Sequence, residues 1–174
     1  LTAGVYAVNR KQRETNSNVM ILDAYLRAMF AGIYTEGEIL NIRGHTEGIA
    51  LRGAFDPYGD LDNPLSKEAN IWGYAYRLGY LQEGYSAVME TGFAGGDENV
   101  ADQDFTGRPI HPEYNVGLLL YDEVLSRTTR AVWTDDANGL WSNGGVYNSR
   151  YIFPTVSYRP MENWELVAGY LMAW

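Results

Sequence analysis

Cysteine is absent from this 174-residue sequence, and long apolar runs are absent as well. Without cysteine the chain has neither a disulfide framework nor a thiolate metal site, and this absence fits a reducing cytosol and a cell envelope equally well. No apolar run approaches the 18 residues that a membrane-spanning helix needs. The sequence therefore excludes a helical membrane protein.

Positive charge is also scarce. The chain has 13 Lys and Arg against 22 Asp and Glu, giving a formal net charge of −9. Because its basic residues do not cluster into a face that could neutralise phosphates, we expect no nucleic-acid partner. The whole net charge falls in three long polar stretches, residues 53–69, 95–114 and 135–145, whereas the short turns are nearly uncharged.

Tyrosine, tryptophan and glycine are abundant, and they occur in alternating patterns. Within residues 70–81, Trp72, Tyr74 and Tyr76 alternate with glycine, alanine and Arg77. A period of two with interior glycines favours a strand over a helix. The segment 84–95 alternates in the same way after a short turn, so the two segments predict a β-hairpin.

Residues 18–51 allow two interpretations at their start. As a helix, Leu22 and Leu26 share an apolar face; as a strand, the even positions from Met20 to Phe30 are apolar and the odd positions Asp23 and Arg27 are polar. A second alternating segment follows Thr35-Glu36-Gly37. We therefore favour a hairpin with its turn at 35–37.

The same patterns predict further strands along the chain. Both faces of 115–125 carry leucine, and Pro154 would place its strand at the edge of a soluble sheet. Single-chain bacterial barrels have even strand numbers, so an odd count implies that missing sequence or an additional chain completes the sheet. The nine predicted strands are 3–12, 19–34, 38–52, 70–81, 84–95, 115–125, 127–134, 148–159 and 164–174.

Long alternating strands with short turns at one end and long acidic loops at the other are typical of an all-β fold, the transmembrane antiparallel up-and-down β-barrel. We expect one such domain, or a portion of a larger barrel, across residues 1–174. Aromatic residues near the strand ends are predicted to form interfacial girdles. Charges of both signs at mid-strand are predicted to line the pore: Asp23, Arg27, Arg43, His45, Glu47, Arg77 and Glu90.

Several segments resemble outer-membrane β-barrel proteins of Gram-negative bacteria, in the alginate-export-like and myxobacterial or deltaproteobacterial group. The resemblance is carried by YLRAMFAGIYTEGEILNIRG, NVGLLLYDEVL, GGVYN and VSYRPMENWELVAGYLMAW. It implies a location in the bacterial outer membrane, with membrane lipid as a partner. The resemblance carries over no site residues.

Motifs for chemistry are few. Asp56, Asp60 and Asp62 are weak calcium-ligand candidates, but Leu61 and Lys67 occupy the positions where an EF-hand needs glycine and glutamate, so a solvated acidic loop is favoured. The only histidines are His45 and His111, no G-x-S-x-G nucleophile elbow is present, and nothing singles out a carboxylate pair. We therefore expect no enzyme and no cofactor.

These observations predict a porin or substrate-specific channel for small hydrophilic solutes, with a small polar or anionic solute as its ligand. Two alternatives from other classes remain open. The barrel could be a structural sleeve or anchor for a partner protein. The chain could instead be a secreted β-sandwich that binds carbohydrate through exposed Trp and Tyr.

Overall fold

A computed structural model describes residues 1–13, 16–47, 66–96, 104–107, 110, 114, 116 and 146–174. Their regular structure is entirely β, which excludes the helical interpretation of residues 19–30. In these residues there is no helix with the length and apolar character that crossing a membrane requires. The strands are β1 (Thr2–Gln12), β2 (Ser17–Phe30), β3 (Ile33–Glu47), β4 (Ser66–Gln82), β5 (Tyr85–Ala94), β6 (Asp104–Phe105), β7 (Ser149–Met161), β8 (Trp164–Gly169) and β9 (Met172–Ala173).

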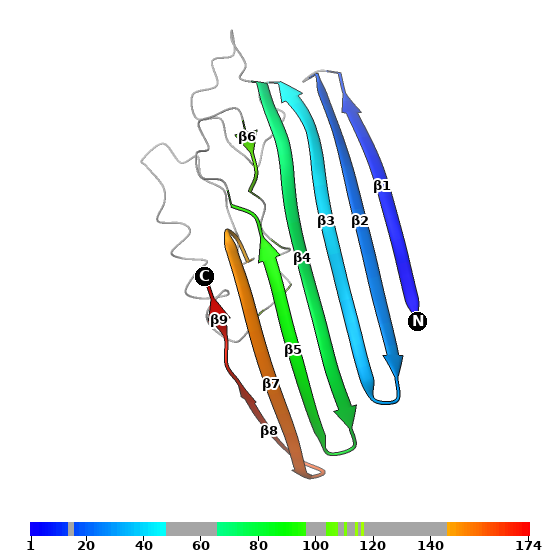
Figure 1. Cartoon of the computed structure of the whole chain (residues 1–174), viewed down its shortest axis with the longest axis vertical. Helices are drawn as coiled ribbons and strands as arrows, with labels where there is room; N and C mark the ends of the chain where they lie inside the picture. The colour runs from blue at the N-terminus through cyan, green and yellow to red at the C-terminus, as the bar shows by residue number, and fades with distance from the viewer. Residues whose placement is uncertain are drawn as a thin grey trace.

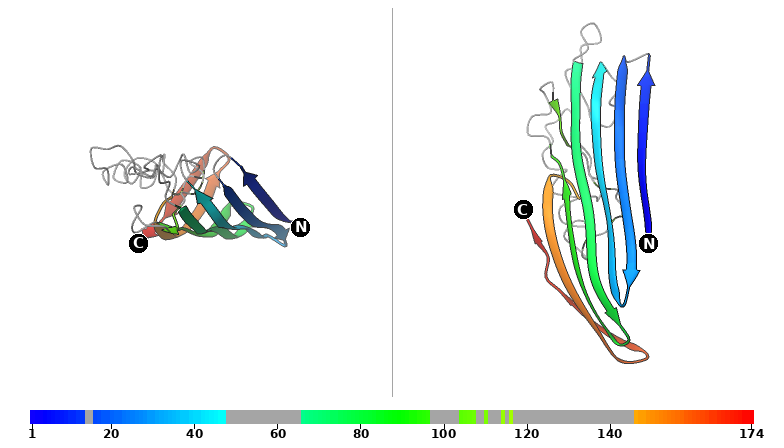
Figure 2. Two further views of the ribbon diagram at one scale, coloured as in Figure 1. Left: turned by 90° about the horizontal axis from the view of Figure 1, so that it is seen from above. Right: turned by 45° about the vertical axis from the view of Figure 1, so that its right-hand side comes forward.

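The strands form one sheet with up-and-down topology (Figure 1). Its order is β1-β2-β3-β4-β5-β7-β8, with antiparallel neighbours throughout; the short β6 runs parallel to β4, and β9 pairs with β7. Figure 2 shows that the sheet is twisted and curved. Strands β1 and β8 lie at opposite edges and do not pair, so the described sheet is not closed into a barrel, as the sequence predicted.

Most predicted strands agree with the structure, but some boundaries and two segments do not. The predicted loop 53–69 is too long, because its last residues, from Ser66, already belong to β4. Two residues of the predicted loop 95–114 form β6. The predicted strands 115–125 and 127–134 lie outside the described residues apart from Val116, and the predicted loop 135–145 lies wholly outside them.

Pro154 does not lie in an edge strand, the position expected for it in a soluble sheet, because β7 has neighbours on both sides. On one side Pro154 lies opposite Met89 of β5. On the other side the pairing stops at Gly169 and resumes at Met172, so the interruption between β8 and β9 faces the proline. Since proline has no N–H to donate, the partner strand is broken at the place where a ladder hydrogen bond cannot form.

The predicted turn at 35–37 is also wrong, because those residues lie inside β3 and the turn is Ala31-Gly32. Both turn residues have positive φ, 49° and 81°, the backbone of the two-residue type I′ turn that suits the twist of a hairpin. The Gly32 carbonyl accepts a hydrogen bond from the Leu81 N–H at 2.7 Å. Phe30 consequently pairs with Ile33, and this register decides which face each β3 side chain occupies.

Substitutions at this turn are expected to have opposite effects. Ala31→Gly should stabilise the hairpin by about 1 kcal/mol, because alanine is strained at positive φ. Gly32→Ala should destabilise it by about 1–2 kcal/mol, because an added Cβ would lie 2.8 Å from the Leu81 carbonyl oxygen as well as at positive φ. Urea unfolding of the two variants measures both effects, and equal signs would contradict the turn.

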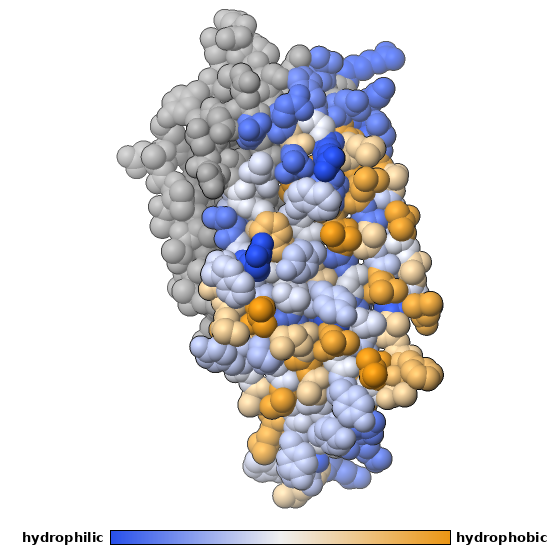
Figure 3. Space-filling view, viewed as in Figure 1, coloured by the Kyte–Doolittle hydropathy of each residue, from blue (hydrophilic) through white to orange (hydrophobic). Residues whose placement is uncertain are grey.

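The register separates the sheet into two faces. The apolar face contains odd-numbered residues of β1, β3 and β5 and even-numbered residues of β2, β4, β7 and β8. In Figure 3, which shows it, most hydrophobic side chains lie over the middle of the strands, hydrophilic ones gather mainly at the upper end, and one strongly hydrophilic residue also lies over the middle. Its large exposed side chains are Val5, Met20, Leu22, Leu26, Phe30, Ile33, Ile39, Trp72, Tyr76, Leu78, Tyr80, Tyr85, Met89, Val156, Tyr158 and Leu166.

The opposite face, called the polar face, carries charged and hydroxyl side chains at mid-strand and the small cores of the molecule. One core joins Ile42, Ala69 and Ile71. The other joins Ala94 and Tyr151 with Val116 and Val146, which lie outside the strands. The large exposed apolar side chains of this face lie near the sheet edges or a turn: Tyr6, Val8, Met29 and Val167. The described core is therefore one-sided.

Successive short turns shift along the strand direction. Strand β4 continues two residues beyond Tyr80, which lies opposite Ile33 at the start of β3. Strand β7 continues three residues beyond Tyr158, which lies opposite Tyr85 at the start of β5. Five residues across four strand spacings, at about 3.3 Å per residue and about 4.8 Å between strands, give a slope of about 40°. The three short turns would lie in one plane if the strands were tilted by that angle from the perpendicular to the plane.

Candidate functional site

Four charged residues lie side by side across the polar face. Arg27 of β2 pairs in register with Glu36 of β3, Glu36 with Arg77 of β4, and Arg77 with Glu90 of β5. The signs alternate along this set, which we call the charge row. Opposite charges on directly opposing residues of neighbouring strands attract each other, so the row also favours this strand register.

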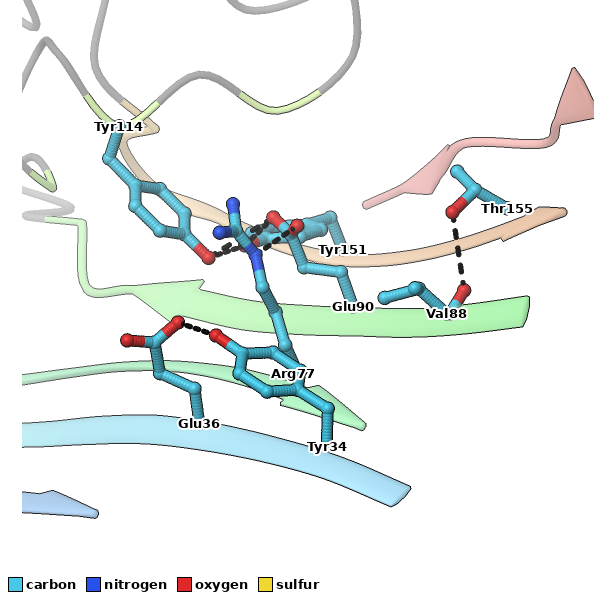
Figure 4. Close-up of polar contacts among 8 residues, drawn as sticks. All are labelled: Tyr34, Glu36, Arg77, Val88, Glu90, Tyr114, Tyr151 and Thr155. Atoms are coloured by element: carbon cyan, nitrogen blue, oxygen red, sulfur yellow. Dashed lines mark hydrogen bonds and ion pairs between the residues drawn. The ribbon is translucent and has the colours of Figure 1, made fainter. Parts of the chain in front are cut away.

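Glu90 is the most enclosed member of the charge row, with only 8% of its surface exposed. Its Oε2 lies 2.6 Å from the Arg77 Nε. Its Oε1 accepts hydrogen bonds from the Tyr151 hydroxyl at 3.0 Å and the Tyr114 hydroxyl at 3.1 Å (Figure 4). A buried carboxylate is stable only with such partners, and here one guanidinium and two hydroxyls supply them.

Tyr151 fits beside Glu90 because its neighbour on β5 is glycine. The Tyr151 side chain is fully buried, and its ring lies against Gly92, its register partner. A Cβ added at Gly92 would collide with that ring. Glycine at this position therefore makes room for the tyrosine whose hydroxyl reaches Glu90.

Tyr114 lies outside the sheet and contacts the charge row. The Arg77 guanidinium lies 5.1 Å from the centre of its ring, within the range of a cation–π contact. Burial raises the pKa of Tyr114 to about 12, so its hydroxyl stays protonated and donates to Glu90 at neutral pH. Val116, two residues further along the chain, is buried with Ala94. Tyr114 and Val116 therefore contact the sheet through both polar and apolar groups.

Glu36 is the second carboxylate of the charge row, and it also accepts two tyrosine hydroxyls. Tyr25 donates to its Oε1 at 3.0 Å, and Tyr34 donates to its Oε2. The Arg27 guanidinium lies 5.8 Å from the centre of the Tyr34 ring. Both carboxylates thus sit between cations and tyrosines, in a surface that is neutral overall but strongly polar.

This arrangement is suited to orienting a polar solute. Fixed charges of alternating sign produce a field along the row, and the tyrosines add hydroxyl donors and ring surfaces. Among the described residues no group of three or more His, Asp or Glu side chains could hold a metal ion. The weak calcium candidates Asp56, Asp60 and Asp62 lie outside these residues, and so does His111.

The seven residues predicted to line a pore do not share one face. Asp23, Arg27, Arg77 and Glu90 lie on the polar face. Arg43 and His45 lie on the apolar face near the long-loop end, where His45 Nδ1 contacts Glu68 Oε1 at 2.9 Å. Glu47 is the last residue of β3 and pairs in register with Ser66.

The prediction of a common face is wrong because of the turn. A three-residue turn at 35–37 would align the odd residues of β2 and β3, whereas the two-residue turn at 31–32 aligns odd with even. The same error hid Glu36, which was assigned to the turn instead of the charge row. Once Ala31-Gly32 is recognised as the turn, alternation alone places Tyr34, Glu36 and Glu38 on the polar face.

Comparison of the chain with protein-family models, with curated proteins and with solved structures finds no match.

Proposed function

We propose that this chain forms part of the wall of an outer-membrane β-barrel that serves as a channel for small hydrophilic solutes. The observation that carries the proposal is the exposed apolar face, which lies opposite a charged face across one sheet. In a transmembrane barrel the first face contacts lipid and the second faces the lumen. The resemblance to Gram-negative outer-membrane barrels agrees with this location.

Three polar side chains in the middle of the apolar face support contact with lipid, because each is hydrogen-bonded inside the protein. The Thr35 hydroxyl donates to the Tyr76 hydroxyl at 3.0 Å, and the Thr91 hydroxyl donates to the Tyr151 carbonyl at 2.8 Å. The Asn41 amide donates to the Ile71 carbonyl at 3.0 Å. A hydrocarbon environment demands such internal pairing, whereas water does not.

The stagger of the turns supports the same proposal. Its slope of about 40° falls within the strand tilt of about 35–45° in transmembrane barrels. With that tilt, Phe30, Tyr80, Tyr85 and Tyr158 lie near one membrane surface, where aromatic side chains are favoured. The unpaired edges at β1 and β8 require further strands in lipid, from elsewhere in the protein or from another chain.

Two alternatives make different demands on the fold. A carbohydrate-binding sandwich needs two packed sheets, and the described strands form one. A structural sleeve or anchor would have the same wall as a channel, so the fold does not separate the two. Conductance does, because a sleeve would pass no ions when reconstituted alone.

The test is electrical recording of the full-length protein in planar bilayers. We expect discrete conductance steps, and we expect Arg27→Glu to shift permeability towards cations by about twofold or more, since it replaces a positive charge of the lumen with a negative one. Arg43→Gln is the matched control, because it removes a charge from the apolar face and should leave ion selectivity unchanged. Absence of conductance from protein recovered in the membrane fraction would favour the sleeve.

A further inference from the structure

The apolar face carries an open hollow of about 600 Å³ that extends across β1 to β4, from the start of β1 to the middle of β4. It exists because small residues at Ala3, Ala24 and Gly37 lie between larger ones. The Tyr76 ring folds over Gly37, where an added Cβ would lie 2.8 Å from the ring. Its remaining lining on this face is apolar or aromatic: Val5, Leu26, Ile39, Tyr74 and Tyr76.

An exposed cation lies on the same face towards the long-loop end. Arg43 is four residues beyond Ile39 on β3, a distance of about 13 Å along the strand. Its guanidinium lies 5.8 Å from the centre of the Trp72 ring. The nearby carboxylate of Glu68 contacts His45, while Lys11 adds a second exposed cation to this end of the apolar face.

From this placement we infer that Arg43 and the hollow together bind one anionic phospholipid. The phosphate lies at the Arg43 guanidinium beside Trp72, and an acyl chain fills the hollow. The site depends on the proposed contact of the apolar face with lipid. A chain from the edge of the hydrocarbon to its middle spans about 15 Å, close to the separation of Arg43 and Ile39.

Charge and shape both select this occupant. Arginine binds phosphate through several N–H donors and remains charged at any physiological pH. An acyl chain fits an open hollow lined mainly by apolar side chains, whereas a soluble anion would gain nothing from it. A zwitterionic lipid would fill the hollow but would offset part of the attraction to Arg43 with its own cation.

The experiment measures lipid retained by the full-length protein. Protein extracted in mild detergent is mixed with phosphatidylglycerol or phosphatidylcholine, and bound lipid is counted by native mass spectrometry. We expect phosphatidylglycerol to bind more tightly, with about tenfold weaker binding in Arg43→Gln and in Ala24→Phe, which fills the hollow. Ala87→Phe, on the same face outside the hollow, and Arg159→Gln, near the short turns, should bind like the wild type.

Several outcomes of this experiment would overturn the proposed lipid site. Equal binding of the two lipids, or wild-type binding by both Arg43→Gln and Ala24→Phe, would overturn the site. Loss of phosphatidylglycerol on adding inorganic phosphate at the same concentration would also overturn it, because the acyl chain would then contribute nothing. Protein absent from the membrane fraction would overturn the proposed function too, whereas a conducting protein without these lipid effects would overturn this inference alone.

Discussion

Leu26→Arg is expected to destabilise the protein in lipid vesicles by about 2–4 kcal/mol, because Leu26 lies at mid-strand on the apolar face with 43% of its surface exposed and would contact lipid in the proposed barrel. Tyr25→Arg, one residue away on the polar face, should change stability by less than about 1 kcal/mol. The new guanidinium would lie near Glu36 and Glu38, so it replaces the lost hydrogen bond with ion pairs. Urea unfolding from lipid vesicles measures both variants.

Adjacent residues make this comparison internally controlled, since both substitutions introduce the same side chain into the same strand. Equal penalties at the two positions would count against lipid on the apolar face. Ile39→Arg should behave like Leu26→Arg, because Ile39 also lies on the apolar face. Ile42→Arg should also destabilise, but for another reason: Ile42 is 6% exposed and packs with Ala69 and Ile71 on the polar face.

The second large effect concerns the pair of Arg77 and Glu90. Arg77→Met leaves the Glu90 carboxylate almost fully buried without its cation, and we expect a loss of about 2–4 kcal/mol in the free energy of unfolding. Glu90→Met should cost about 1–3 kcal/mol, less because the Arg77 side chain remains about one-third exposed and keeps contact with water. Equilibrium unfolding of the two variants in lipid vesicles measures both losses.

The double variant Arg77→Met/Glu90→Met is the informative member of this set. Two apolar side chains of similar volume leave no buried charge, so its stability should return to within about 1 kcal/mol of the wild type. Its Tyr114 and Tyr151 hydroxyls still bond each other, at 3.2 Å in the structure. Additive losses in the double variant would contradict the direct coupling of the two charges.

Tyr114 gives the charge row its connection to a segment outside the sheet, and sequence periodicity could not reveal that connection. Its partners, Arg77, Glu90 and Tyr151, come from β4, β5 and β7. Alternation identifies which side chains share a face within a strand, but contacts from a loop depend on where the loop folds. The single clue in the sequence was a tyrosine within a polar stretch, and a tyrosine in a loop can equally well face water.

The sequence by itself determined that the chain is an all-β protein with long antiparallel strands, short turns at one end and apolar side chains alternating with polar ones. Those features follow from local chemistry, because strand geometry places successive side chains on opposite faces whatever the neighbouring strands do. The positions of β1, β2, β5 and β7 were accordingly predicted to within a few residues. The register of neighbouring strands, like the position of Tyr114, was beyond this local information.

Tertiary structure decided which alternate side chains of neighbouring strands share a face. A turn of two residues at Ala31-Gly32 instead of three at 35–37 moved Arg43 and His45 to the apolar face and brought Glu36 between Arg27 and Arg77. A change of one residue in a turn reverses the facing of a whole strand, because the side-chain period is two. Cross-strand pairing, not periodicity, therefore created the charge row and placed Arg43 beside the apolar hollow where we propose a lipid site.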